Sequence, residues 1–199
     1  QLRLYLALNA INSLISARRA RQLLAAFGSL EAVFAASPQN LFQAGLSERA
    51  AQALAQPDRE YAETALAWAD RPGRYILTDA DAAYPQLLRH IADPPLLLFC
   101  EGDIDLLNQP ALAVVGSRAP TPIGLETAQA FAAQLARLGF VITSGMALGI
   151  DTAAHRGALS VNGRTVAVLG TGLDRIYPAR NVELAAQIRG TGVLISEFP

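Results

Sequence analysis

A buried strand that ends in glycine and leads directly into a helix most constrains how this chain folds. Phe140–Thr143 is a short apolar run, Ser144 and Gly145 follow it, and the pattern of Thr152–Leu159 is helical. Asp151 stands just before that helix, so we expect it to be the N-cap. A glycine-bearing turn between a strand and a helix leaves backbone N–H groups exposed, and such groups bind anions. Residues 144–155 therefore predict an anion-binding turn.

The same alternation of strand and helix repeats through the C-terminal part of the chain. Short, unbroken apolar runs predict buried strands at Ala111–Val115, Phe140–Thr143, Thr165–Leu169 and Val193–Ser196. Helical patterns separate these runs, and the first of them extends over Leu125–Leu138. Such alternation indicates a parallel sheet with right-handed crossovers. The expected fold class is therefore α/β, with an extended Rossmann-like domain over residues 75–199 whose sheet is truncated at the C-terminus.

The N-terminal part has a different pattern. Residues 1–56 contain several short helical segments separated by Ser and Gly, with Ser16 and Ser47 as expected N-caps. This pattern suggests a small all-α domain of the SAM-like or helix-hairpin-helix type. Residues 57–74 form a connecting helix and turn. Helix-hairpin-helix units bind the DNA backbone, but a spacer or protein-contact module has the same pattern. We expect the arginines at 18, 19 and 21 to form a solvated helix face.

Charge places limits on any nucleic-acid site. The net charge is −1, and all sixteen basic residues are Arg. Arg suits bidentate recognition of phosphate, although codon usage alone also produces this composition. Because the chain as a whole is not basic, a nucleic-acid site must be a local patch. No apolar run is long enough to span a membrane, and a single cysteine fits a reducing compartment, so we expect a cytoplasmic protein with no membrane partner.

Three loops, at residues 116–124, 144–155 and 170–178, carry the residues that we expect to bind phosphate. In an open α/β sheet, ligands bind beyond the carboxyl ends of the strands, and all three loops follow strands there. Arg118 is the main candidate, because it follows a strand in a glycine–serine turn. Tyr177 offers a ring on which a base can stack. The other predicted nucleic-acid-binding residues lie in these loops, which are rich in small and donor residues: Gly116, Ser117, Ser144, Gly145, Met146, Gly170, Thr171 and Gly172.

The sequence gives little sign of catalysis. Asp151 and His155 share a helix face and could act as a general base, but no Ser or Cys nucleophile has an evident place beside them. We expect both residues to support the loop instead. Metal-ligand spacing, a Walker A sequence and a dinucleotide fingerprint are all missing from the sequence. We therefore expect no catalytic residue, no metal and no cofactor.

Four ordered motifs resemble the DNA-processing protein A family, also called DprA or Smf. They are Gly116-Ser117-Arg118 through Gly124, Ser144–Asp151 with His155, Gly170–Asp174 with Tyr177-Pro178 and Asn181, and Ser196–Pro199. Tyr84-Pro85 and Asp93-Pro94-Pro95 resemble the lead-in to the family's extended Rossmann fold, and the N-terminal helices resemble its SAM-like domain. The resemblance therefore covers nearly the whole chain.

The resemblance implies a non-enzymatic protein of natural transformation, or competence. Such a protein binds and protects incoming single-stranded DNA, loads the RecA recombinase for DNA recombination, and is a homodimer at full length. Arg118 would contact DNA phosphate, while Asp151, His155, Asp174 and Asn181 would support the loops. Ile123 stands where the family often has Tyr. The family's downstream Arg-Asn-Arg-Ile segment does not occur before Pro199, so we expect weak DNA binding and no dimer for residues 1–199 alone.

Two other functions are compatible with the sequence. Related Rossmann folds include nucleotide-cleaving phosphoribohydrolases, but the catalytic Glu of their glycine-rich loop has no counterpart in Gly170–Arg175. The second alternative is a protein-interaction role in which the loops bind no DNA.

Overall fold

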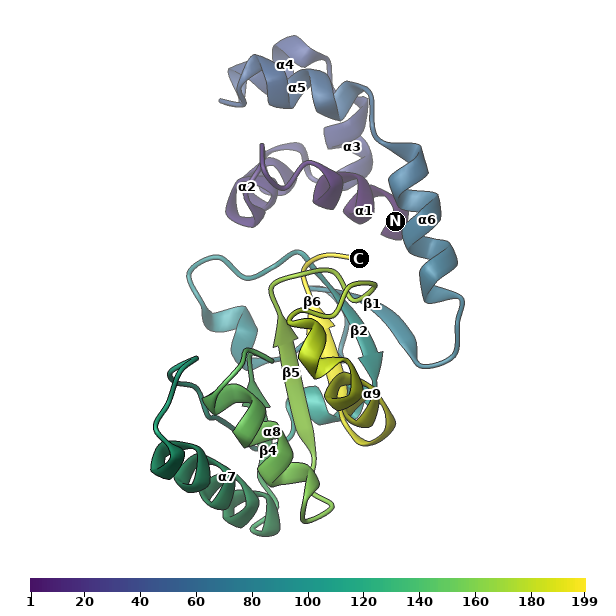
Figure 1. The fold of residues 1–199 in the computed structure, drawn as a ribbon. Coiled ribbons are helices and arrows are strands. Elements are labelled where there is room, and N and C mark those ends of the chain that lie inside the picture. The colour runs from purple at the N-terminus through teal and green to yellow at the C-terminus, as the bar shows by residue number, and fades with distance from the viewer. The chain divides into compact units, whose positions relative to one another are not determined.

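The computed structural model describes all 199 residues, which divide into two compact units (Figure 1). The first unit contains residues 1–71, 78–81 and 86–97. The second contains residues 72–77, 82–85 and 98–199. Residues 57–71, expected as part of a connection, thus belong to the helical unit. None of the helices has the length and apolar character needed to cross a membrane.

The first unit consists of short helices whose starts are fixed by polar caps. Four serines at residues 16, 29, 37 and 47 each accept a hydrogen bond from the backbone N–H three positions on, and Asp58 caps the sixth helix in the same way. Such caps satisfy N–H groups that the first helical turn leaves unpaired. The helices are α1 (Leu2–Ala10), α2 (Ala17–Phe27), α3 (Leu30–Ala35), α4 (Pro38–Gln43), α5 (Glu48–Ala55) and α6 (Arg59–Ala69).

The arginines of α2 are more constrained than the sequence predicts. Arg21 donates from Nε and Nη2 to Asp79 at 3.0 and 2.7 Å. Arg19 donates to the carbonyl oxygen of Ala44, and Arg18 donates to that of Ala92. The expected solvated face is therefore only partly correct: Arg18 is exposed, whereas Arg19 and Arg21 are half-buried, and all three side chains fasten α2 to the rest of its unit.

A six-stranded sheet forms the centre of the second unit, in the order β1-β2-β6-β5-β4-β3. The four strands from β3 to β6 run parallel, whereas β2 pairs with β6 in the antiparallel direction. A short 3-10 helix, η1 (Leu87–His90), belongs to the first unit, and η2 (Ile104–Asn108) follows β2. The strands are β1 (Arg74–Thr78), β2 (Leu97–Gly102), β3 (Ala111–Ala113), β4 (Val141–Ser144), β5 (Thr165–Leu169) and β6 (Val193–Ser196).

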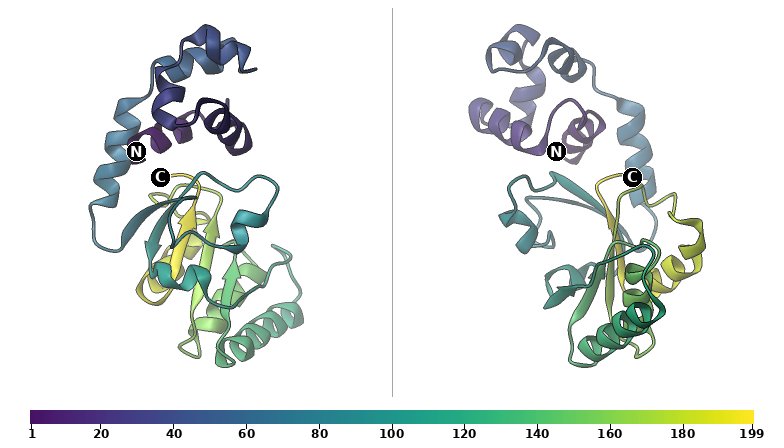
Figure 2. Two further views of the ribbon diagram at one scale, coloured as in Figure 1. Left: turned by 180° about the vertical axis from the view of Figure 1, so that it is seen from behind. Right: turned by 60° about the vertical axis from the view of Figure 1, so that its left-hand side comes forward.

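Three helices connect the parallel strands: α7 (Pro122–Arg137), α8 (Ile150–Leu159) and α9 (Val182–Thr191). Each crossover moves one strand further in the same direction, so right-handed connections put all three helices on one face of the sheet (Figure 2). Ile142 of β4 packs there with Ala132, Ala154 and Ala158. Small residues on α7 and α8 let the two helices approach closely, and this fixes the loops at their N-terminal ends.

β3 corrects one prediction. We expected a buried strand over Ala111–Val115, but β3 ends at Ala113 and all three of its residues are exposed. It is the edge strand, with β4 as its only hydrogen-bonded neighbour. An apolar run indicates that a strand is suited to burial, but it carries no information about how many neighbours cover it.

The starts of α7 and α8 also differ from prediction. Thr121 caps α7, and Pro122 occupies its first turn, so the helix begins three residues before the predicted Leu125. The N-cap of α8 is Gly149, not Asp151. Asp151 lies inside the first turn with its side chain buried, and its Oδ2 accepts a hydrogen bond from Ala147 N at 3.3 Å. It therefore caps the turn before the helix instead of the helix itself.

Candidate functional site

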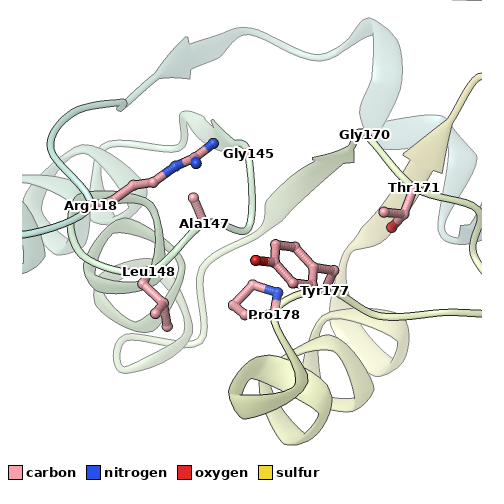
Figure 3. A pocket seen from close by; sticks show the side chains of 8 residues that line it. All are labelled: Arg118, Gly145, Ala147, Leu148, Gly170, Thr171, Tyr177 and Pro178. Atoms are coloured by element: carbon pink, nitrogen blue, oxygen red, sulfur yellow. The ribbon is translucent and has the colours of Figure 1, made fainter.

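A pocket of about 280 Å³ opens at the carboxyl edge of the parallel strands (Figure 3). Three loops line it: the one after β3 supplies Arg118, the one after β4 supplies Gly145 and Ala147, and the one after β5 supplies Gly170 and Tyr177. Leu148, Thr171 and Pro178 complete the lining. The three loops converge because parallel strands end at the same edge of a sheet. No carboxylate lines the pocket, so its charge comes from Arg118.

Arg118 presents its guanidinium group without a protein partner. The residue is exposed, and its side chain makes no hydrogen bond or ion pair. The backbone beside it is fixed, however: Ser117 Oγ accepts from Ala119 N at 3.1 Å, and Ser117 O accepts from Ile150 N at 3.1 Å. Arg118 is thus an unpaired cationic side chain on an anchored loop.

Gly149 allows the loop after β3 to lie close to the turn between β4 and α8. Its φ of +84° and ψ of −126° belong to a region that only glycine enters readily. A Cβ at this position would also collide with the carbonyl oxygen of Ser117 and lie 2.8 Å from Pro120 Cδ. The Arg118 loop therefore rests directly on the backbone that begins α8.

The turn after β4 buries a residue that we predicted to bind nucleic acid. Met146 has a φ of +62°, and its side chain is completely buried, so this side chain does not line the pocket. The left-handed backbone turns the side chain inward and leaves Gly145 and Ala147 at the pocket. Ser144 is also buried, and its hydroxyl donates to Val114 O at 2.7 Å.

Asn181 holds this turn from the far side. It lies in η3 (Ala179–Asn181) and is buried. Its Nδ2 donates to Met146 O at 2.8 Å and to Thr152 Oγ1 at 2.9 Å. Thr152 Oγ1 in turn donates to Ala147 O at 2.7 Å. These bonds connect the loops after β4 and β5, which agrees with a loop-supporting role for Asn181.

His155 is a core residue whose pKa is strongly lowered. It is completely buried, and its Nδ1 lies 2.7 Å from Thr165 Oγ1. Because the Thr165 hydroxyl already donates to Ile142 O at 2.6 Å, Nδ1 must carry the proton and donate to Thr165. Nε2 then has no hydrogen-bond partner. Burial lowers the pKa of His155 to about 4, against a smaller opposing effect of the Ser144 backbone.

The alternative in which Asp151 and His155 pair as a general base does not occur. Asp151 bonds to Ala147 N and His155 to Thr165, and neither side chain lines the pocket. Nothing positions either group as a general base. No group of three or more His, Cys, Asp or Glu side chains is arranged to hold a metal ion.

The loop after β5 forms the opposite wall of the pocket. Thr171 Oγ1 donates to Arg175 O at 3.0 Å, and Ser196 Oγ donates to Thr171 O at 2.7 Å. Tyr177 is 68% exposed, and its ring faces the pocket across from Arg118 (Figure 3). Gly172 does not line the pocket: a Cβ there would collide with Pro199 O and lie 2.7 Å from Asp174 Oδ1. Asp174 thus packs beside the turn of this loop.

Half of the predicted contact residues line the pocket. They are Arg118, Gly145, Gly170, Thr171 and Tyr177. The other half, which includes Gly116 and Ser117, lie in the same loops but outside the lining. Sequence reasoning missed Ala147, Leu148 and Pro178. All three stand in the motifs described above, and Ala147 and Pro178 are each adjacent to a predicted contact, Met146 and Tyr177, so adjacency was the signal that could have found these two.

Comparisons with known proteins agree with the motifs. A model of the family described as DNA recombination-mediator protein A matches residues 75–199. Over 160 residues the chain is 42% identical to Protein Smf of Escherichia coli K12, covering 80% of this chain and 43% of that protein. Over 118 residues it is 46% identical to DNA processing protein DprA of Streptococcus pneumoniae R6, covering 59% of this chain and 42% of that one.

Two solved structures are similar as well. The X-ray structure of DprA from S. pneumoniae superimposes with a TM-score of 0.70 at 35% identity, covering 82% of this chain and 56% of that chain. DNA processing protein A from Helicobacter pylori, described as having a unique single-stranded DNA binding mode, gives a TM-score of 0.54 at 35% identity, covering 63% and 55%. These relatives are considerably longer than the 199 residues here.

Proposed function

The chain belongs to the DNA recombination-mediator protein A family, and from this we propose that its strand-end pocket binds single-stranded DNA. The observation that carries the proposal is Arg118, an exposed guanidinium without a protein partner in a pocket free of carboxylates. A phosphate there gains charge-assisted hydrogen bonds without displacing an internal ion pair. The exposed ring of Tyr177 provides a surface on which a base stacks.

We also propose a cellular role for this DNA binding. We propose that the protein acts in natural transformation, where it protects incoming strands and loads a RecA-type recombinase on them, and that the full-length protein is a homodimer. The family description as a recombination mediator supports this role. The role requires no catalysis and is cytoplasmic. The phosphoribohydrolase alternative finds no support, because the pocket contains no carboxylate to act as its catalytic Glu.

Arg118→Ala tests the assignment. We expect about a tenfold or larger loss of affinity for labelled oligo(dT), measured by fluorescence anisotropy, since a charge-assisted bond contributes about 1.5–3 kcal/mol. The slope of log affinity against log salt should fall by about 0.7, the value for one phosphate contact on a single strand. The loss should be independent of base sequence, because phosphate contacts do not read bases.

Arg137→Ala serves as the matched control. Arg137 is an exposed arginine in the last turn of α7, at the end of the helix away from the strand-end loops. It should leave affinity and salt slope unchanged. Equal affinity of Arg118→Ala and the unmodified chain across a salt titration would refute the assignment.

A further inference from the structure

A second cleft, of about 440 Å³, adjoins the strand-end pocket. It lies between the first half of α7, the start of α8 and η3. Three arginines from three different segments line it: Arg118 after β3, Arg156 on α8 and Arg180 in η3. Its polar lining also includes Gln129, Thr152 and Asn181, and no acidic residue takes part. We call it the arginine cleft.

These arginines differ from most others in the same unit. Arg74 and Arg189 pair with Glu101 at 3.0 and 2.5 Å, and Arg164 donates to Thr191 O at 2.8 Å. Arg137 donates to Gln134 at 3.4 Å. By contrast, the side chains of Arg118, Arg156 and Arg180 are exposed and make no hydrogen bond or ion pair. Stability of the fold therefore does not account for them.

The convergence itself has an electrostatic consequence. Like charges that share a concave surface with no counter-charge raise the local potential, and the low-dielectric walls of a cleft focus it. An anion relieves this repulsion, so the arrangement favours a ligand with negative charge. Because the three guanidinium groups come from separate segments, a ligand with several anionic groups matches them better than one small ion.

The cleft is continuous with the strand-end pocket. Arg118 and Leu148 line both hollows, so the turn after β4 forms a ridge between them. Asn181 lines the cleft and also holds that turn through Met146 O, which ties the two hollows into one rigid surface. Apolar lining from Leu125, Leu148 and Pro120 suits the sugars and bases between phosphates.

We propose that the arginine cleft is a second phosphate subsite, so that one DNA strand occupies the strand-end pocket and then crosses Arg118 into the cleft. The proposal rests on the proposed function and extends it. Arg156 and Arg180 bind phosphates next to those bound at the pocket, and the number of nucleotides that the protein contacts exceeds what the pocket alone holds.

The double variant Arg156→Gln/Arg180→Gln tests this proposal on the full chain. Its affinity is measured for oligo(dT) of increasing length, from the shortest that the unmodified chain binds. We expect little change for the shortest oligonucleotide and at least a tenfold loss for longer ones. The salt slope for longer strands should fall by about 1.4, or 0.7 for each phosphate contact removed. Arg118→Ala should weaken binding at every length.

The control is Arg137→Gln/Arg164→Gln, which removes the same charge from exposed positions outside the cleft. It should bind all lengths as the unmodified chain does. If the cleft variant also does so, the second subsite is wrong while the proposed function stands. If both variants lose affinity for long strands and the cleft variant loses no more than the control, the loss reflects net charge alone and the second subsite is equally wrong. Failure of the unmodified chain to bind oligo(dT) of any length removes both proposals.

Discussion

Arg118 and His155 each have a polar group without a protein partner, for opposite physical reasons. The guanidinium of Arg118 is exposed, so water satisfies it until a phosphate takes the place of that water. Nε2 of His155 is buried where neither water nor protein reaches it, and a proton there would be a desolvated charge. The first group is therefore suited to bind a ligand, and the second to remain neutral inside the fold.

The burial of His155 predicts how stability depends on pH. In the unfolded chain His155 regains its ordinary pKa of 6.5, whereas the folded value is about 4. Between these values the unfolded state binds more protons, so the free energy of unfolding falls as pH falls and is constant well above pH 6.5. From pH 7 to pH 5 the loss due to this residue is about 2 kcal/mol.

His155→Asn removes this dependence and keeps a donor for Thr165. Urea unfolding at pH 7 and pH 5 should show a smaller difference in the variant than in the unmodified chain by roughly that amount. His90 is exposed, and His90→Asn should leave the difference unchanged. An unaltered pH difference in His155→Asn would contradict the buried neutral imidazole.

At single residues, the predicted contacts that line the pocket belong to residue types with one chemical use. Arg118, Gly145 and Tyr177 were predicted because a cation, a glycine turn and an exposed ring after strands suit phosphate and base. Met146 was predicted as a contact but its side chain is buried, since its direction depends on a left-handed φ that methionine does not signal. Arg156 and Arg180 had no signal, since only the packing of α8 and η3 brings them to one cleft.

At the level of elements, the site depends on two turns that are locked together. The N-cap glycine of α8 lies under the Ser117–Arg118 backbone, and Ile150 N donates to Ser117 O at 3.1 Å. Asp151 and Asn181 hold the preceding turn through Ala147 N and Met146 O. The geometry of the pocket is therefore a property of the start of α8.

Gly149→Ala should disturb both stability and binding. The positive φ is strained for alanine, and the methyl group would meet Ser117 O, so we expect about 2 kcal/mol or more of destabilisation in urea unfolding. Displacement of the Arg118 loop should also weaken oligo(dT) binding by more than the fraction of unfolded protein explains. Gly190→Ala is the control, because Gly190 is in α9 with nothing near its Cβ position, and it should be as stable or slightly more so.

Element positions were largely predictable, because caps and apolar runs are local signals. The serine caps of α2 and α5 were predicted at Ser16 and Ser47, and the predicted strand Thr165–Leu169 has the observed bounds. The burial of β3 was not predictable, since burial depends on neighbours that the run of residues does not specify. The N-cap of α8 was misassigned because Asp is a common cap, whereas tight loop packing selected Gly149.

For the whole molecule, a net charge of −1 conceals an uneven use of arginine. In the second unit, Arg74 and Arg189 form ion pairs with Glu101. The arginines without a partner that line the arginine cleft gather near the carboxyl edge of the sheet. The sequence predicted that a site must be a local patch, and the division into two units limits the pocket and the cleft to the second one. Total charge gave no indication of where the patch lies.

Cys100 gives a test of cooperative folding. It is the only cysteine, it is completely buried in β2, and burial raises its pKa to about 12. Because only the thiolate reacts, a chromogenic disulfide reagent at pH 8 should label the native chain far more slowly than the unfolded chain. Labelling across a urea series should follow the circular dichroism transition. Rapid labelling without urea would show that the sheet opens locally, and Cys100→Ala gives the background rate.

The anchored loop beneath Arg118 has a kinetic consequence. Ser117, Gly149 and Ile150 fix the backbone of the site before any ligand arrives, so complex formation requires rotation of side chains only. Association with a single strand should then occur in one phase, with a rate proportional to DNA concentration and without a plateau from a slow rearrangement. The rate constant should decrease with salt, because encounter depends on the arginine-rich edge. Differences in residence time between variants will then report the contacts formed after encounter.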